Sequence, residues 1–151
     1  LFRRALEGQE KALGTDHPST LSSVNSLGRL LAKKGDLEGA EKLFRRALEG
    51  KEKALGPEHP DTLMSVNNLG FLLNNKGNPN EALELLRSRS TLSPEADDAL
   101  SYNLACSECL TGNLEEAKRV ITKHLEAHPE KKENALKDDD LAAIRDFIET
   151  L

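Results

Sequence analysis

The chain has 151 residues, a net charge of −5 and only 3% aromatic residues. An acidic chain does not suit nucleic acid as its main partner, because phosphates favour a basic surface. No apolar stretch reaches the roughly 20 residues that a bilayer-spanning helix needs, so no membrane contact is expected. Two cysteines are too few for a disulfide scaffold and favour a cytoplasmic protein with reduced thiols.

Apolar residues recur with helical spacing along the chain, and no segment alternates apolar and polar residues as a strand would. His-Pro pairs at 17–18 and 59–60 mark helix starts, because Pro suits the first turn. Gly-Asx pairs at 35–36, 77–78 and 112–113 mark turns in which Gly ends one helix and Asp or Asn caps the next. The predicted helices span residues 1–13, 18–34, 37–54, 60–75, 79–91, 94–111, 114–127 and 139–150, with a loop or short helical turn at 130–138.

The sequence also repeats itself with a period of 42 residues. Residues 1–34 and 43–76 agree at 25 of 34 positions, and the run from 1 to 8 returns unchanged at 43–50. Self-similarity at this period is typical of stacked arrays whose units share one continuous core. We expect the two helices of each hairpin to approach closely where small residues lie 12 positions apart across a turn: Gly28 with Ala40, Gly70 with Ala82 and Ala105 with Ala117.

These residues resemble tetratricopeptide repeats. The small residues just named match the family's small positions. In the first helix of each hairpin, the small residue follows a Leu, as it does in the family. The large second-helix residue and the closing Pro of the family are matched by Phe44, Leu86, Ile121, Pro94 and Pro129. The 42-residue length and the motif Leu-Gly-x-x-His-Pro-x-Thr-Leu at 13–21 and 55–63 are similar to the kinesin-light-chain type of repeat. Arg89 and His124 depart from the pattern, because the family usually has a small residue there.

The resemblance covers about residues 1–130 and implies an all-α fold, a right-handed α-solenoid of antiparallel helical hairpins with a C-terminal capping helix. The expected units are the second helix of a truncated repeat at 1–13, repeats at 18–54, 60–91 and 94–127, and the capping helix at 139–150. The capping helix should turn Leu141, Ile144, Phe147 and Ile148 inward. Because the chain begins inside a repeat and without Met, we expect a piece of a longer array that ends near residue 151.

The differences between the two 42-residue copies suggest where a ligand binds. Five of the nine fall on the first helix of the hairpin, and positions 22, 26, 29 and 33 form one stripe at 100° per residue. In the resemblance, this stripe faces the concave groove that holds peptides. Either the groove diverged to fit a ligand, or an exposed face drifted freely. The predicted groove residues are Ser22, Asn25, Arg29, Lys33, Met64, Asn67, Asn68, Phe71, Asn74, Tyr102, Asn103 and Cys106.

The predicted function is a scaffold for protein–protein interaction that binds a peptide or protein segment in this groove. Asn amides can pair with an extended backbone, and Arg29 with Lys33 would attract an acidic side chain or a carboxylate. Phe71 and Tyr102 are either apolar anchors or core residues that pack on a neighbouring helix. The alternatives are an accessory domain of a larger signalling protein or enzyme, or a homodimer through the N-terminal helix, whose exposed residues would be Leu1, Phe2, Leu6 and Leu13.

No pattern in the sequence indicates catalysis or a cofactor, and we predict neither an enzyme nor a metal site. Cys106-x-x-Cys109 lies within a predicted helix, where a redox pair lacks its usual setting after a strand. His124 and His128 could complete a Cys₂His₂ zinc site with it, but no short ligand loop holds them. His17 and His59 are predicted to be turn or capping residues. Asp138-Asp139-Asp140 is interpreted as a helix cap and not as a calcium site.

Overall fold

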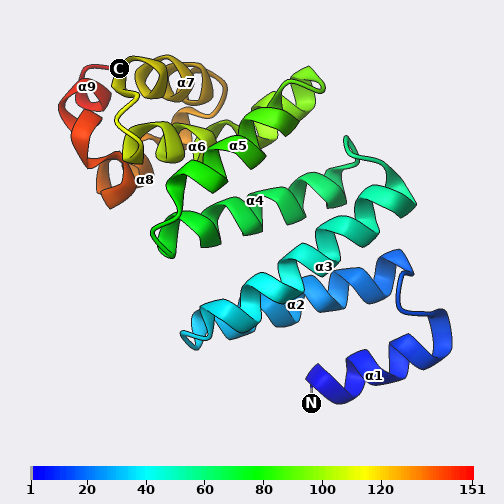
Figure 1. The fold of residues 1–151 in the computed structure, drawn as a ribbon. Coiled ribbons are helices and arrows are strands. Elements are labelled where there is room, and N and C mark those ends of the chain that lie inside the picture. Colours follow the sequence, from blue (N-terminus) through cyan, green and yellow to red (C-terminus); the bar gives the residue numbers. More distant parts are fainter. Residues whose placement is uncertain (1) are drawn as a thin grey trace. The chain divides into compact units, whose positions relative to one another are not determined.

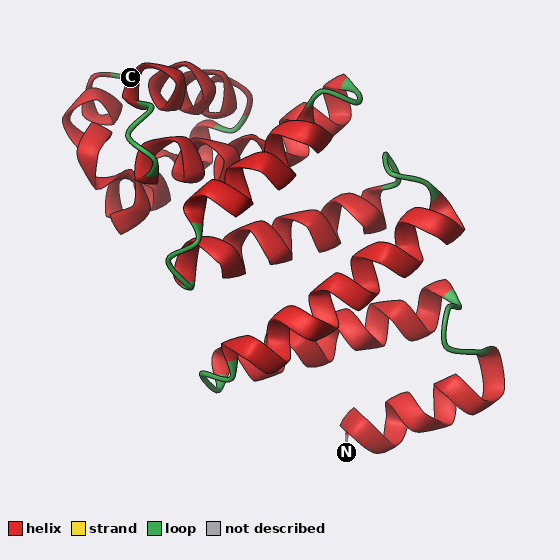
Figure 2. Cartoon of the chain, viewed as in Figure 1, coloured by secondary structure: helices red, strands yellow, loops and turns green. Residues whose placement is uncertain are grey.

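The computed structural model describes residues 2–151, with side chains from residue 4 onward. Helices account for all the regular structure in this part of the chain, and short loops join them (Figure 2). The chain divides into two compact units, Leu1–Leu72 and Leu73–Leu151. The predicted all-α array of consecutive hairpins is therefore confirmed. None of the helices in the described range has both the length and the apolar composition that a bilayer crossing requires.

The first unit contains three complete helices and most of a fourth. They are α1 (Phe2–Leu13), α2 (Pro18–Lys33), α3 (Leu37–Leu55) and α4 (Pro60–Asn75), of which the last continues beyond the unit boundary (Figure 1). These bounds agree with the predicted ones to within one residue. Helices α2 and α3 pack against each other along their length, as the short turn between them predicts.

The close contact within the α2–α3 hairpin differs from the expected pairing of two small residues. A methyl group added at Gly28 would lie 2.7 Å from Cε1 of Phe44, so the bare backbone of α2 accommodates an aromatic ring. Phe44 is 2% exposed, and Ala40 is fully buried. The physical reason is size: the space above a glycine is filled best by a large flat side chain four residues beyond the expected partner.

The core cluster of the first unit includes Leu6, Val24, Leu27 and Ala47. Leu6 is only 8% exposed, so the expectation that α1 offers this residue to a second chain is wrong. The apolar face of α1 packs on α2 and reaches α3 instead. Of the other residues of that expectation, Leu1 and the side chain of Phe2 lie outside the described part of the chain, and Leu13 is exposed.

The second unit continues with α5 (Pro79–Ser90), α6 (Pro94–Leu110) and α7 (Leu114–Ala127), in which α6 contacts both neighbours. After α7 the chain forms a 3₁₀ turn (Pro129–Lys131), α8 (Lys132–Lys137), a second 3₁₀ segment η2 (Asp139–Ile144) and α9 (Arg145–Thr150). The predicted single helix at 139–150 is thus wrong. The backbone leaves the helical region at Ile144, and the tighter 3₁₀ spacing brings Leu141 and Ile144 to one buried side.

The helix ends explain why the boundaries were predictable. Gly35, Gly77 and Gly112 all have positive φ, between 80° and 84°, and end a helix as expected. Asp36 caps α3 by accepting a hydrogen bond from the Gly39 N–H at 2.9 Å. Asn78 and Asn113 at the two equivalent turns make no such side-chain bond. The side chain of Asn113 donates to Glu108 at 3.0 Å.

The two His-Pro histidines are capping residues, as predicted. The Nδ1 atom of His17 accepts the backbone N–H of Ser19, and that of His59 accepts the backbone N–H of Asp61. This role needs a neutral imidazole acceptor at each helix start.

Candidate functional site

The exposed face of α4 carries the largest apolar side chains among the predicted groove residues. Met64 is 51% exposed and Phe71 is 54% exposed. They lie seven residues apart, or two helical turns, and so share one side of the helix. Asn67 and Asn68 are half-buried between them. The opposite side of α4 is buried and contributes Leu63, Val66 and Leu69 to the core.

The equivalent face of α2 is polar. Ser22 is half-buried, Asn25 is 4% exposed, and Arg29 and Lys33 are exposed one turn apart. Arg29 occupies the position that Phe71 has in the second copy. The duplicated helices thus offer different chemistry on one face: positive charge on α2 and apolar surface on α4.

Two side-chain amides on these faces are only partly satisfied. Among the described residues, neither Oδ1 of Asn25 nor Nδ2 of Asn68 has a hydrogen-bond partner, although both atoms are buried. A buried polar atom without a partner costs about 1–3 kcal/mol. A ligand backbone or an ordered water at these positions would remove that cost.

The remaining predicted groove residues belong to the second unit and are engaged within it. Asn74 is buried, and its Oδ1 accepts the Ser107 hydroxyl at 3.0 Å. The Tyr102 hydroxyl donates to Oδ2 of Asp138 at 2.8 Å. Cys106 is 2% exposed, and its Sγ lies 3.9 Å from the same carboxylate oxygen.

The chain's own C-terminal segment therefore covers this face of α6. Segment η2 packs on α6, so a partner could reach Cys106 only after displacing it. Asn103 is half-buried. Sequence reasoning missed Asp138 as the partner of Tyr102, because 36 residues separate them and no local pattern links the two.

Comparisons with known proteins agree with this geometry. The family model described as tetratricopeptide repeat matches residues 1–53 and 24–95, which together exceed half of the chain. The chain belongs to the tetratricopeptide repeat family. Such domains are generally protein-interaction modules and are typically non-catalytic. No curated protein matches the sequence.

Two similar solved structures come from Podosopora anserina and are titled as a kinesin light chain with nearly identical TPR-like repeats; one of them is a single-residue variant. The variant matches with a TM-score of 0.74 and 24% identity over 87% of the present chain. The other matches with a TM-score of 0.71 and 26% identity over 83%. The present chain spans 66% and 63% of those two chains.

The cysteine pair of this repeat protein is buried and unreactive in character. Both cysteines are free thiols. Burial raises the pKa of Cys106, and the nearby carboxylate of Asp138 raises it further. Burial also raises the pKa of Cys109. Because the thiolate is the nucleophile, the raised pKa values make the two thiols less reactive than exposed cysteines.

The two cysteines are not grouped with the histidine pair of α7. The potential ligands gathered around His124 and His128 include Asp98 of α6, and neither cysteine is among them. Cys106 is grouped instead with Asp138 and Asp140. The spacing of the histidines was visible in the sequence, but their acidic partner was not, because it comes from the preceding helix.

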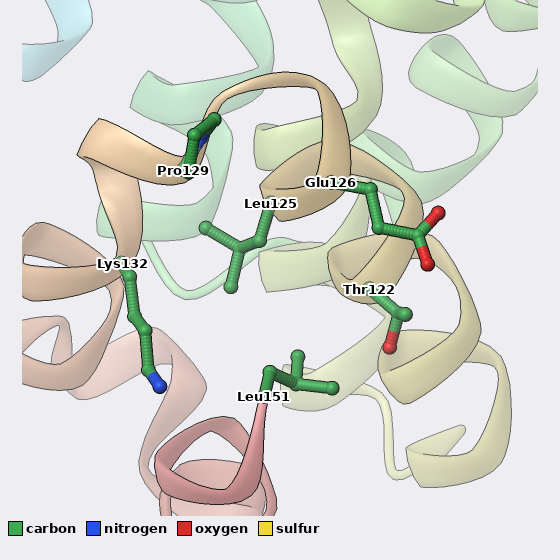
Figure 3. A pocket seen from close by; sticks show the side chains of 6 residues that line it. All are labelled: Thr122, Leu125, Glu126, Pro129, Lys132 and Leu151. Carbon is green, nitrogen blue, oxygen red and sulfur yellow. The ribbon is translucent and has the colours of Figure 1, made fainter.

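The surface of the second unit also has two hollows. One of about 610 Å³ is lined by Arg87, Glu108, Arg119 and other residues. Its charges are already paired: Arg87 binds the buried Glu108 through two hydrogen bonds of 2.7 Å. The other, of about 200 Å³, is lined by Thr122, Leu125, Glu126, Pro129, Lys132 and Leu151, whose polar ends point in different directions (Figure 3). Neither hollow has converging polar groups that would define a small-molecule site.

Proposed function

We propose that this tetratricopeptide array binds an extended protein segment along the exposed faces of α2 and α4. The observation that carries the proposal is the exposure of Met64 and Phe71 on the one helical stripe where two nearly identical copies differ. Exposed apolar side chains arranged in this way are typical of interaction sites. The kinesin-light-chain names of similar structures belong to those proteins and do not specify a partner here.

The chemistry of the two faces indicates what the segment would contain. Phe71 and Met64 would bury an apolar side chain of the partner, and the half-buried Asn67 and Asn68 between them would pair with its backbone. Arg29 and Lys33 would attract an acidic side chain or a terminal carboxylate. The partner is therefore a peptide segment with an apolar and an acidic residue.

Segment binding is favoured over the alternatives. Self-association through α1 was expected to use four apolar residues, and of these only Leu13 has a described side chain that is exposed. Leu6 is part of the core. A role as an accessory domain is compatible with segment binding and changes nothing on these faces. A cytoplasmic location is part of the proposal and is supported by the two free thiols.

The test begins with capture of the partner on the immobilised chain and sequencing of the bound peptide. Phe71→Ala is then expected to weaken binding of the synthetic peptide by at least about tenfold, since a central aromatic anchor carries much of the energy of an interface. Arg29→Glu and Asn67→Ala are expected to weaken it as well. Isothermal titration calorimetry gives the affinity, and circular dichroism checks that helix content is unchanged.

Leu110→Ala is the matched control, because Leu110 is also a large exposed apolar residue, 41% exposed, but lies outside these faces. It should bind as wild type. If Phe71→Ala and Arg29→Glu also bind as wild type, the faces of α2 and α4 are not the binding site.

A further inference from the structure

Three potential metal ligands meet between α6 and α7. Asp98 lies on α6, His124 lies on α7, and His128 ends α7. One ligand atom of each lies within 4.8 Å of the others. The Nε2 atom of His128 is 3.0 Å from Oδ1 and 3.2 Å from Oδ2 of Asp98. The two imidazole rings are one helical turn apart, with centroids separated by 4.8 Å.

A hydrogen-bond chain fixes the tautomer of His124. The Ser101 hydroxyl donates its single proton to the backbone carbonyl of Asp98 at 2.8 Å. It must therefore accept in its 2.7 Å contact with Nδ1 of His124, so Nδ1 carries the proton. The Nε2 atom is left with a free lone pair, which is the form of imidazole that binds a metal. Such an outer hydrogen bond is usual for metal-binding histidines.

The other two ligands are more accessible than His124. His124 is 9% exposed. Asp98 is exposed, His128 is half-buried, and the carboxylate of Glu130 lies 3.9 Å from Nδ1 of His128. The carboxylates of Asp98 and Glu130 can therefore balance the charge of a cation. Water can reach the ion from the exposed side, where Asp98 and His128 lie.

We propose that Asp98, His124 and His128 form a binding site for a divalent transition metal of the zinc type. Ligands at about 2.0–2.2 Å from tetrahedral zinc lie roughly 3.4 Å from one another. Nε2 of His128 and Oδ1 of Asp98 are joined by a hydrogen bond of 3.0 Å, and a bound ion would take the place of that hydrogen bond. Two imidazoles favour zinc, nickel or copper over magnesium or calcium, which prefer oxygen ligands. The site goes beyond segment binding and lies on residues that the proposed interface does not use.

Binding a metal here would join α6 to α7. The three ligands come from two helices of the second unit, so the ion would add a cross-link at the end of α7, where the chain turns into the C-terminal segment. In the other group of potential ligands, Cys106 with Asp138 and Asp140, the carboxylate of Asp138 already accepts the Tyr102 hydroxyl, so we base no proposal on it.

The experiment is titration of the chain, residues 1–151, with Zn²⁺ by calorimetry, repeated with Mg²⁺. We expect saturable binding of one Zn²⁺ and none of Mg²⁺. His128→Gln and Asp98→Asn remove a ligand at an accessible position and should each weaken Zn²⁺ binding by more than about tenfold. Ser101→Ala should weaken Zn²⁺ binding by about tenfold. It removes the hydrogen bond that holds the proton on Nδ1 of His124, but it does not remove a ligand.

His59→Asn is the control, since it removes a histidine from the first unit and leaves a residue that can still cap α4; it should bind as wild type. Co²⁺ in place of Zn²⁺ reports the ligand type, and a spectrum without a thiolate charge-transfer band is expected. The absence of saturable binding, unchanged binding by His128→Gln and Asp98→Asn, or a thiolate band would each overturn the site.

Discussion

Helices α1 and α3 repeat one stretch of sequence in two different surroundings. Residues 1–8 and 43–50 are identical, yet Ala5 and Gly8 of α1 are exposed, whereas their equivalents Ala47 and Gly50 of α3 are buried. A leucine is buried in both helices, at Leu6 and at Leu48.

Their neighbours account for the difference. Helix α3 packs along α2, and its Lys51 reaches the start of α4. Helix α1 contacts α2 and meets α3 through the core at Leu6 and through an ion pair of 2.7 Å between Glu10 and Arg46. An amphipathic sequence thus determines which residues can be buried, while the number of packed neighbours determines which of them are.

The largest expected contrast comes from placing a charge at the equivalent alanines. Ala47→Glu should lower the free energy of unfolding of the first unit by about 3–5 kcal/mol, because the carboxylate would enter a core of Leu6, Val24 and Leu27 without a partner. Ala5→Glu should change it by no more than about 0.5 kcal/mol, as at other exposed positions. Urea unfolding followed by circular dichroism measures both.

Equal losses for the two variants would contradict this contrast, since they would show that α1 is as enclosed as α3. The wild-type chain under the same conditions provides the reference. Because the chain divides into two compact units, the unfolding curves should be tested for more than one transition before they are fitted.

A smaller contrast is expected at the equivalent glycines, where the two alanine substitutions should change the free energy of unfolding in opposite directions. A methyl group added at Gly50 would lie 2.6 Å from Cδ1 of the fully buried Leu21. A methyl group added at Gly8 would have no neighbouring atom of the described residues within 4 Å, apart from its own helix backbone and chain neighbours. Gly50→Ala should therefore destabilise by about 1 kcal/mol net, as overpacking exceeds the gain in helix propensity. Gly8→Ala should stabilise by up to about 1 kcal/mol. Stabilisation by both, measured by urea unfolding, would show that Leu21 moves freely.

The fold could be predicted from the sequence because its signals are local. His17 and Asp36 cap helices through backbone groups two or three residues away, and the Gly turns need only a positive φ. In the segment 139–150 the burial of Leu141, Ile144 and Ile148 was predicted correctly. The break at Ile144 was not predicted, because the spacing of apolar residues does not distinguish a 3₁₀ segment followed by a short helix from one continuous helix.

The candidate sites were predictable only where one helix holds the whole pattern. The stripe of Met64 and Phe71 follows from helical spacing alone, and both are exposed. The cover over Cys106 and the carboxylate beside His128 come from segments about 30 residues away. Such contacts depend on packing between elements, so a single sequence contains no direct signal for them.

The smallest contrast concerns the single sequence difference between α1 and the equivalent residues 44–55 of α3, which is Gln9 in the first copy and Lys51 in the second. Lys51 is 2% exposed, and its Nζ donates to the backbone carbonyl of Asp61 at 3.3 Å. Burial lowers its pKa, although the charge of Asp61 opposes the shift. Lys51→Gln places the residue of the first copy in the second and removes the titrating group.

The expected result is a pH-dependent difference in stability between wild type and Lys51→Gln. Because the folded pKa is below that of the unfolded chain, about 10.4, the unfolded chain binds more protons between the two values. The stability of wild type relative to the variant should therefore rise as pH increases through that window, and level off above it. Thermal unfolding of both proteins from neutral to alkaline pH measures this difference. A flat difference would mean that the ammonium remains hydrated, and that α3 is less enclosed at Lys51 than its packing on α2 and α4 implies.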